Sequence, residues 1–62
     1  METTYHEIDD LPVTVDTDSR RARAWSGSSS WPIPFTEVVV KGRPISQREF
    51  DRLRRLAAKL AP

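Results

Sequence analysis

Residues 46–62 have the pattern of a single amphipathic helix, and this pattern constrains how the rest of the chain folds. Ser46 and Glu49 form an S-x-x-E capping box, which marks the start of a helix. At about 100° per residue, five apolar side chains fall on one arc of this helix: Phe50, Leu53, Leu56, Ala57 and Leu60. Because an apolar arc must be buried against another element, the preceding sequence has to supply a surface for it.

The sequence before this helix indicates strands. Apolar and polar residues alternate from Leu11 to Asp16 and again from Arg20 to Trp25, as in half-buried strands. The run of turn formers from Asp16 to Ser19 separates the two segments. We therefore predict a hairpin over residues 11–25.

A third strand is predicted at residues 36–41, where Val38, Val39 and Val40 are three β-branched residues in a row. Residues 26–35 are serine-rich and then proline-rich, and we expect a loop there. Gly42 to Pro44 would be the turn into the helix at 46–60. Residues 1–10 are expected to form an acidic, partly mobile segment, in which Tyr5 to Ile8 either adds a short strand or lies over the core.

These elements predict an α+β fold: a small three-stranded antiparallel sheet packed against one C-terminal helix, in a single domain of residues 11–62. The helix is needed because a lone small sheet is barely stable in water. Alanines on the inner face of the hairpin would let this helix approach closely. The expected core consists of Leu11, Val13, Val15, Ala22, Ala24, Val38, Val40, Phe50, Leu53, Leu56 and Leu60.

Composition excludes several kinds of stabilisation. The 62 residues contain no cysteine and one histidine, so neither a disulfide framework nor a zinc site is expected, and no cofactor is predicted. Stability must come from a compact core, from self-association or from a bound partner. No apolar run approaches the ~20 residues that span a bilayer. We expect a soluble, cytoplasmic protein that does not contact membranes.

Catalysis is not expected, because a nucleophile needs a base and an orienting group within reach. His6 lies in the acidic N-terminal segment, and the serines at 28–30 lie in a flexible stretch. Asp16 and Asp18 resemble the start of a calcium loop, but the glycine and glutamate required later in such a loop are missing. Both aspartates are better explained as turn residues.

Charge is distributed unevenly along the chain. Residues 1–18 contain six acidic residues and no Lys or Arg, while most of the cations lie in residues 41–62. Four of these cations line up on the helix away from its apolar arc, and Arg21 and Arg23 form a second strip on the hairpin. This pattern favours a polyanion, and we predict a small nucleic-acid-binding regulator, with duplex DNA as the expected partner. Its contact residues would be Arg21, Arg23, Lys41, Arg43, Arg48, Arg52, Arg55 and Lys59.

Two other interpretations remain open. Arginine and aromatic residues also dominate protein–protein contacts, so the chain could be a non-enzymatic module that docks on a larger acidic protein. Its contacts would then be Trp25, Trp31, Ile33 and Phe35. The cations could also be simply solvated. A homo-oligomer is compatible with both binding hypotheses.

Three resemblances bear on the DNA hypothesis. Lys41-Gly42-Arg43-Pro44 resembles the R-G-R-P core of AT-hook peptides, although a plain turn is the better interpretation for a clamped segment. A three-stranded sheet followed by a helix resembles the arm-type DNA-binding domains of phage integrases. The stretch from Trp31 to Phe50 resembles the wing and final helix of excisionase-type regulators. None of these resemblances transfers a functional residue.

Overall fold

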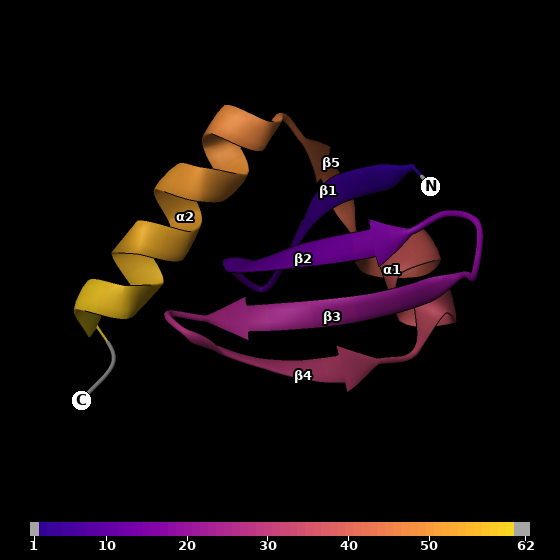
Figure 1. Cartoon of the computed structure of the whole chain (residues 1–62), viewed down its shortest axis with the longest axis horizontal. Coiled ribbons are helices and arrows are strands. Elements are labelled where there is room, and N and C mark those ends of the chain that lie inside the picture. The colour runs from indigo at the N-terminus through magenta and orange to yellow at the C-terminus, as the bar shows by residue number, and fades with distance from the viewer. Residues whose placement is uncertain (1, 61–62) are drawn as a thin grey trace.

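The computed structural model describes residues 2–60, which form one antiparallel sheet and two helices (Figure 1). The sheet has five strands in the order β4-β3-β2-β1-β5. Helix α1 connects the two edge strands, and helix α2 ends the described chain. The elements are β1 (Thr3–Ile8), β2 (Leu11–Asp16), β3 (Arg21–Ser26), β4 (Ser29–Ile33), α1 (Phe35–Lys41), β5 (Arg43–Ile45) and α2 (Gln47–Leu60). The α+β class, with an antiparallel sheet and a C-terminal helix, is confirmed.

The predicted hairpin is present as β2 and β3, paired with Val13 opposite Ala24 and Val15 opposite Ala22. Its turn is organised by Asp16, whose Oδ1 accepts hydrogen bonds from the backbone N–H of Asp18 (3.1 Å) and Ser19 (3.4 Å). This is the local capping of a turn by an aspartate side chain. Hydrogen bonding to Ser19, first through its side chain, lowers the pKa of Asp16.

The prediction of three strands is wrong, because the sheet has five strands and contains two further hairpin connections. β1 pairs with β2 through a two-residue turn in which Asp9 and Asp10 have φ values of 50° and 66°. Positive φ at both positions fits the type I′ turn, which usually contains Asn-Gly. Gly27, at φ 63°, starts the two-residue turn between β3 and β4, in which Ser28 does not have a positive φ. The expected loop at 26–35 is therefore a tight turn followed by an edge strand, and residues 3–8 of the expected mobile segment lie within the sheet.

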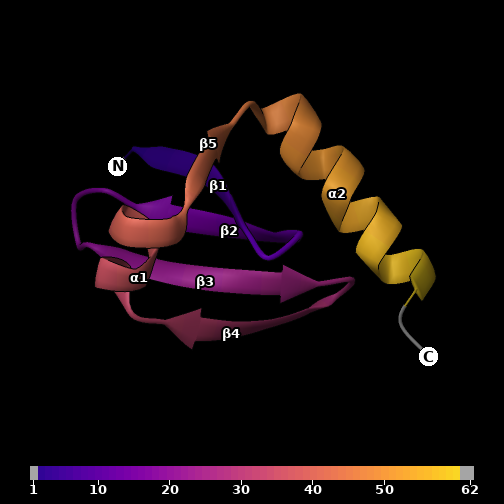
Figure 2. The ribbon, with the colours of Figure 1, turned by 180° about the vertical axis from the view of Figure 1, so that it is seen from behind.

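The prediction of a strand at residues 36–41 is also wrong. The chain must cross from β4 at one edge of the sheet to β5 at the other, and α1 makes this crossing over one sheet face (Figure 2). Phe35 and Val38, about one helical turn apart, pack against the core, and this burial overrides the β-propensity of the valines. The helix ends at Gly42, whose N–H donates to the Val38 carbonyl (2.8 Å). A Cβ at Gly42 would lie 2.5 Å from that oxygen, so the position needs glycine. The expected turn into the C-terminal helix is instead β5.

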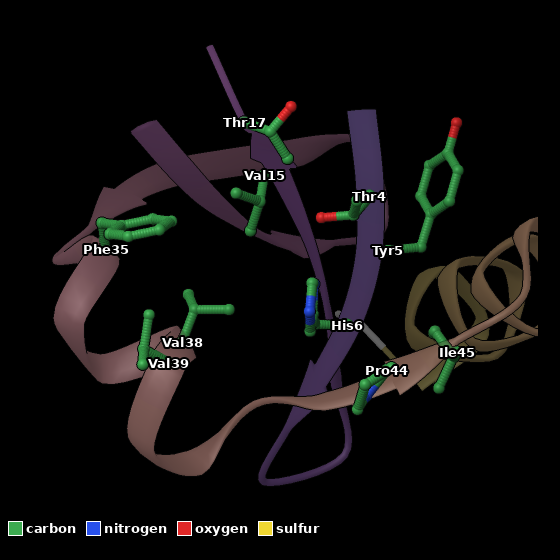
Figure 3. A pocket seen from close by; sticks show the side chains of 10 residues that line it. All are labelled: Thr4, Tyr5, His6, Val15, Thr17, Phe35, Val38, Val39, Pro44 and Ile45. Carbon is green, nitrogen blue, oxygen red and sulfur yellow. The ribbon is translucent and has the colours of Figure 1, made fainter. Parts of the chain in front are cut away.

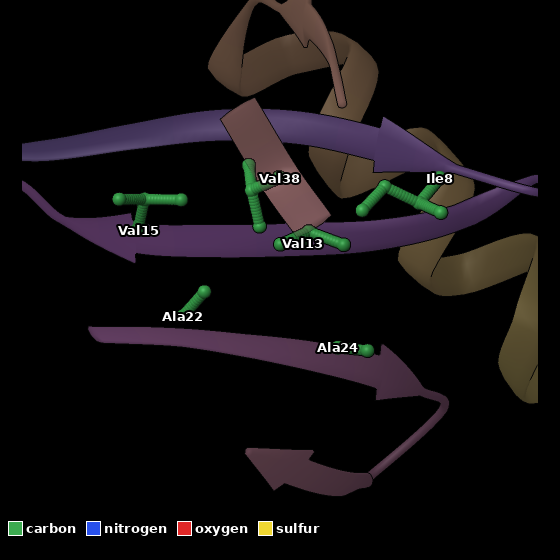
Figure 4. Close-up of a cluster of buried hydrophobic side chains, with 6 residues drawn as sticks. All are labelled: Ile8, Val13, Val15, Ala22, Ala24 and Val38. Carbon is green, nitrogen blue, oxygen red and sulfur yellow. The ribbon is translucent and has the colours of Figure 1, made fainter. Parts of the chain in front are cut away.

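The two helices lie on opposite faces of the sheet. One face, which we call the α1 face, carries Val13, Val15, Ala22 and Ala24, and these side chains cluster with Val38 and Ile8 (Figure 4). The alanines of the hairpin thus admit α1, and not the C-terminal helix as predicted. Val40 is 80% exposed because it lies on the outer side of α1. Its predicted place in the core is wrong.

The opposite face, which we call the α2 face, is covered in part by α2. Ser46 Oγ accepts a hydrogen bond from the Glu49 N–H (3.2 Å), as in the predicted cap. The ring of Tyr5 packs against Phe50 with centroids 5.0 Å apart, and Leu53 is buried beside it. The last turns of α2 reach beyond the sheet. Leu56 and Leu60 are therefore 47% and 78% exposed, contrary to their predicted burial.

Candidate nucleic-acid interface

Strand β3 presents Arg21, Arg23 and Trp25 on the α2 face, because alternate residues of a strand share a face. The Trp25 indole Nε1–H donates to Thr14 Oγ1 (3.1 Å), which fixes the ring on the sheet. The Arg23 guanidinium donates to the side-chain oxygen (3.1 Å) and the backbone oxygen (3.2 Å) of Ser30. Arg23 is thus oriented by neutral acceptors, and its charge is not neutralised by these contacts.

Arg54, on helix α2, contacts Trp25 and so connects α2 with the side chains of Arg21, Arg23 and Trp25 on β3. Its guanidinium carbon lies 5.1 Å from the centroid of the Trp25 ring, a distance typical of a cation–π contact. Sequence reasoning did not include Arg54 among the site residues, since it lies off the helical stripe. Only the fold brings it to Trp25, and no local signal in the sequence indicates the contact.

A shallow groove of about 460 Å³ lies beside the contact between the β3–β4 turn and α2, and both Arg54 and Arg55 line it. The turn approaches the helix closely at Gly27. A Cβ at this position would lie 3.1 Å from Ala58 Cα, and the positive φ also favours glycine. The groove is lined by Gly27 and Ser28 of the turn and by Asp51, Arg54, Arg55 and Ala58 of α2, so the β3 arginines are not part of it.

The outer side of α2 carries the predicted stripe. Arg48, Arg55 and Lys59 are exposed and form no ion pair with any residue from 2 to 60. Arg52 is different, because it pairs with Glu49 one turn earlier. This contact raises the pKa of Arg52 and lowers the pKa of Glu49. Three of the four stripe cations are therefore available to an external anion.

Two of the other predicted contacts lie elsewhere. Arg43, on β5, pairs with Glu7 of β1 at 2.6 Å, and this hydrogen bond raises the pKa of Arg43. Lys41 ends α1, which covers the opposite sheet face. The four residues that resemble an AT-hook are thus the end of a helix and an edge strand, and they do not form a free extended segment. We define the basic surface as Arg21, Arg23, Trp25, Arg48, Arg54, Arg55 and Lys59.

The four residues predicted for protein binding do not come together. Trp25 lies on the α2 face, whereas Trp31, which lies opposite Ala24 in the register, is on the α1 face and 40% exposed. Ile33 and Phe35 are partly buried against the core of that face. A single contact patch made of all four is therefore excluded by the geometry.

A second groove, of about 500 Å³, lies between α1 and the β1–β5 edge (Figure 3). Phe35, Val38 and Val39 line it from the helix, and Pro44 lines it from β5. Within residues 2–60, the Nδ1 atom of His6 is buried in its wall without a hydrogen-bond partner. Burial lowers the pKa of His6, because the charged imidazolium is poorly solvated there.

Two features are absent from the described residues: a cluster of metal-ligating side chains and a helix able to span a membrane. Residues 2–60 contain no group of three or more metal-ligating side chains. Neither helix in this part of the chain has the length and apolar character required to cross a bilayer. Comparisons with known proteins give no further guide: no family model, curated protein or solved structure is significantly similar to this chain.

Proposed function

We propose that this protein binds nucleic acid, with duplex DNA as the first candidate, through the basic surface. The observation that carries the proposal is the continuity of that surface. Arg21 and Arg23 on β3 are linked to α2 through the Trp25–Arg54 contact, and Arg55 continues the surface beside the groove at the β3–β4 turn. Phosphate binding by arginine and lysine supplies most of the affinity of non-specific nucleic-acid binders.

The charge distribution supports this proposal over a merely solvated helix. Arg48, Arg55 and Lys59 have no acidic partner among residues 2–60, while Arg43 and Arg52 each have one. With Arg21 and Arg23, and without Arg54, which stacks on the Trp25 ring, five cations would be available to phosphates. Each neutralised phosphate contributes about −0.9 to the slope of log affinity against log salt, so we expect a slope of about −4 to −5 on duplex DNA.

The test is a titration of a fluorescein-labelled 20-base-pair duplex of mixed sequence, followed by anisotropy at several salt concentrations. Removing Arg55 and Lys59 together, as Arg55→Gln/Lys59→Gln, should make the salt slope shallower by about two and lower the affinity at least tenfold at low salt. Binding that is unchanged in this variant contradicts the proposed surface.

Lys59→Gln and Lys41→Gln provide a matched comparison. Each removes one exposed lysine, yet Lys59 lies on α2 and Lys41 ends α1 on the other sheet face. We expect only Lys59→Gln to weaken binding and to change the slope by about one. Equal losses in both variants would mean that net charge, and not this surface, determines the affinity.

A second candidate function is supported by the apolar groove between α1 and the β1–β5 edge. Val39 and Val40 on α1 are 67% and 80% exposed, and exposed apolar side chains next to a groove are typical of protein-binding surfaces. In this case a protein partner would dock on the α1 side. Val39→Gln/Val40→Gln should then abolish capture of a partner from a cell extract, while Arg55→Gln/Lys59→Gln should leave it unchanged.

A further inference from the structure

We infer that two copies of this chain associate through the C-terminal half of α2, with the two helices packed in parallel about a two-fold axis. The surface concerned is an apolar groove of about 520 Å³, whose lining shares no residue with the basic surface, although Lys59 of the basic surface borders it. Its lining includes Leu11, Leu53, Leu56, Ala57 and Leu60. The inference does not depend on the proposed function, since no nucleic acid takes part in it.

The apolar residues of this groove have the spacing of a helix–helix seam. Leu53, Leu56 and Leu60 are separated by three and four residues, the interval that repeats along the seam of paired helices. Leu53 is buried against the sheet, while Leu56 and Leu60 remain 47% and 78% exposed where α2 extends past the sheet. A second helix would cover these two side chains.

The edges of the sheet do not offer an alternative route to self-association. Pro32 lies on edge strand β4 and Pro44 lies on edge strand β5, and a proline has no N–H to donate to a further strand. The carbonyl oxygen of Ser30, also on β4, accepts a hydrogen bond from Arg23. Strand addition at either edge is therefore disfavoured, and the exposed leucines of α2 are the better contact.

The two flanks of the groove carry opposite charges. On one side Asp9 and Asp10 form the tight turn between β1 and β2 and line the groove. On the other side of the leucines, Lys59 lies along the helix without an ion pair among residues 2–60, whereas Arg52, seven residues earlier, is already paired with Glu49. Neither Asp9 nor Asp10 forms an ion pair within residues 2–60. Both aspartates also adopt positive φ, which a glycine would adopt at lower cost.

This charge pattern selects one arrangement of the two copies. In a parallel pair, the Asp9–Asp10 flank of each protomer faces the flank of its partner that carries the unpaired Lys59. In an antiparallel pair, by symmetry, aspartates would face aspartates and cations would face cations. A second copy packed in parallel is thus complementary in both apolar surface and charge.

The experiment measures the mass of the isolated protein by sedimentation equilibrium, without nucleic acid, from low micromolar concentration to about 1 mM. We expect the mass to rise from 7.1 kDa towards twice that value. Leu56→Gln/Leu60→Gln should weaken association at least tenfold, because two leucines per protomer would no longer be buried. Val39→Gln/Val40→Gln, which changes two exposed aliphatic residues of α1, should leave association unchanged. Circular dichroism confirms that each variant is folded.

The orientation is tested by Asp9→Asn/Asp10→Asn, since asparagine tolerates positive φ and should preserve the turn. In the parallel pair this variant loses attraction and associates several-fold more weakly, and added salt weakens the wild-type dimer. Tighter association of the variant would indicate an antiparallel pair and overturn the arrangement. A wild-type protein that stays at 7.1 kDa throughout would overturn the dimer itself. Loss of association in Val39→Gln/Val40→Gln, with association retained in Leu56→Gln/Leu60→Gln, would also overturn the dimer through α2.

Discussion

Gly27 is the point where the β3–β4 turn meets α2, and Gly27→Ala tests whether this contact holds the helix on the sheet. The glycine is buried and has φ 63°, a region that L-residues enter at a cost of about 1–2 kcal/mol. The new Cβ would lie 3.1 Å from Ala58 Cα and 3.4 Å from Ala58 Cβ. The nearest atom belongs to the helix backbone, so no side-chain rotation can relieve the contact.

Displacing the helix adds an overpacking cost of about 1–2 kcal/mol to the backbone cost. We therefore expect the free energy of unfolding to fall by about 2–4 kcal/mol. For a domain of this size, about 4–8 °C in Tm corresponds to each kcal/mol, so the Tm should fall by about 8–32 °C. That loss is a large part of the total stability expected for a small domain.

Thermal unfolding followed by far-UV circular dichroism measures this loss, with Ser28→Ala as the control. Ser28 is the exposed neighbour in the same turn, and its replacement should change the Tm by no more than a few degrees. A Gly27→Ala protein that melts within about 4 °C of the wild type would show that the turn and α2 can separate freely, which would refute the close-contact argument.

Three other substitutions have defined expected outcomes. Asp10→Gly relieves a positive φ of 66° and should raise the free energy of unfolding by about 1 kcal/mol in chemical denaturation; a decrease contradicts the turn assignment. His6→Leu removes a buried nitrogen without a partner. Because burial lowers the pKa of His6 in the folded state, the unfolded chain binds more protons below the usual histidine pKa of about 6.5. The wild type should therefore lose stability as the pH falls from 7 to 5, and the variant should lose this dependence; an equal slope in both proteins would exclude His6 as the cause. Thr14→Val leaves the Trp25 indole N–H without its acceptor and should cost about 1–2 kcal/mol in thermal unfolding, whereas an unchanged Tm would mean that water replaces the threonine.

The elements that the sequence predicts well are those defined by local periodicity. The β2–β3 hairpin follows from alternation on both sides of the Asp16 turn, and α2 follows from its cap and its apolar arc. Helix α1 is not predicted by local propensity, because Val38, Val39 and Val40 are β-branched and favour a strand. The better signal was Pro34 immediately before the segment and Gly42 immediately after it, since proline favours helix starts and glycine favours helix ends.

The additional strands were missed for a different physical reason. The β1–β2 turn uses Asp9 and Asp10 in place of the usual Asn-Gly, so the common hairpin signal is absent. The burial of β1 depends on partners that only the completed sheet provides. The exposure of Leu56 and Leu60 has a similar origin, because the angle at which α2 leaves the sheet cannot be deduced from helical spacing.

Helical spacing does place Arg48, Arg55 and Lys59 on one side of α2, and this part of the candidate site needs no tertiary information. The pairing of Arg52 with Glu49 was also visible in principle, since residues three apart on a helix are neighbours. The contacts of Arg54 with Trp25 and of Arg43 with Glu7 join residues that are distant in sequence. They decide which cations belong to the basic surface, and only the fold reveals them.

The central claim is that the basic surface on β3 and α2 binds nucleic acid, and the most direct test is the salt dependence of duplex binding. We expect micromolar affinity at low salt and a log–log slope of about −4 to −5. The slope should become shallower by about two in Arg55→Gln/Lys59→Gln. Absence of binding at about 20 mM salt, where non-specific association is strongest, would contradict the claim.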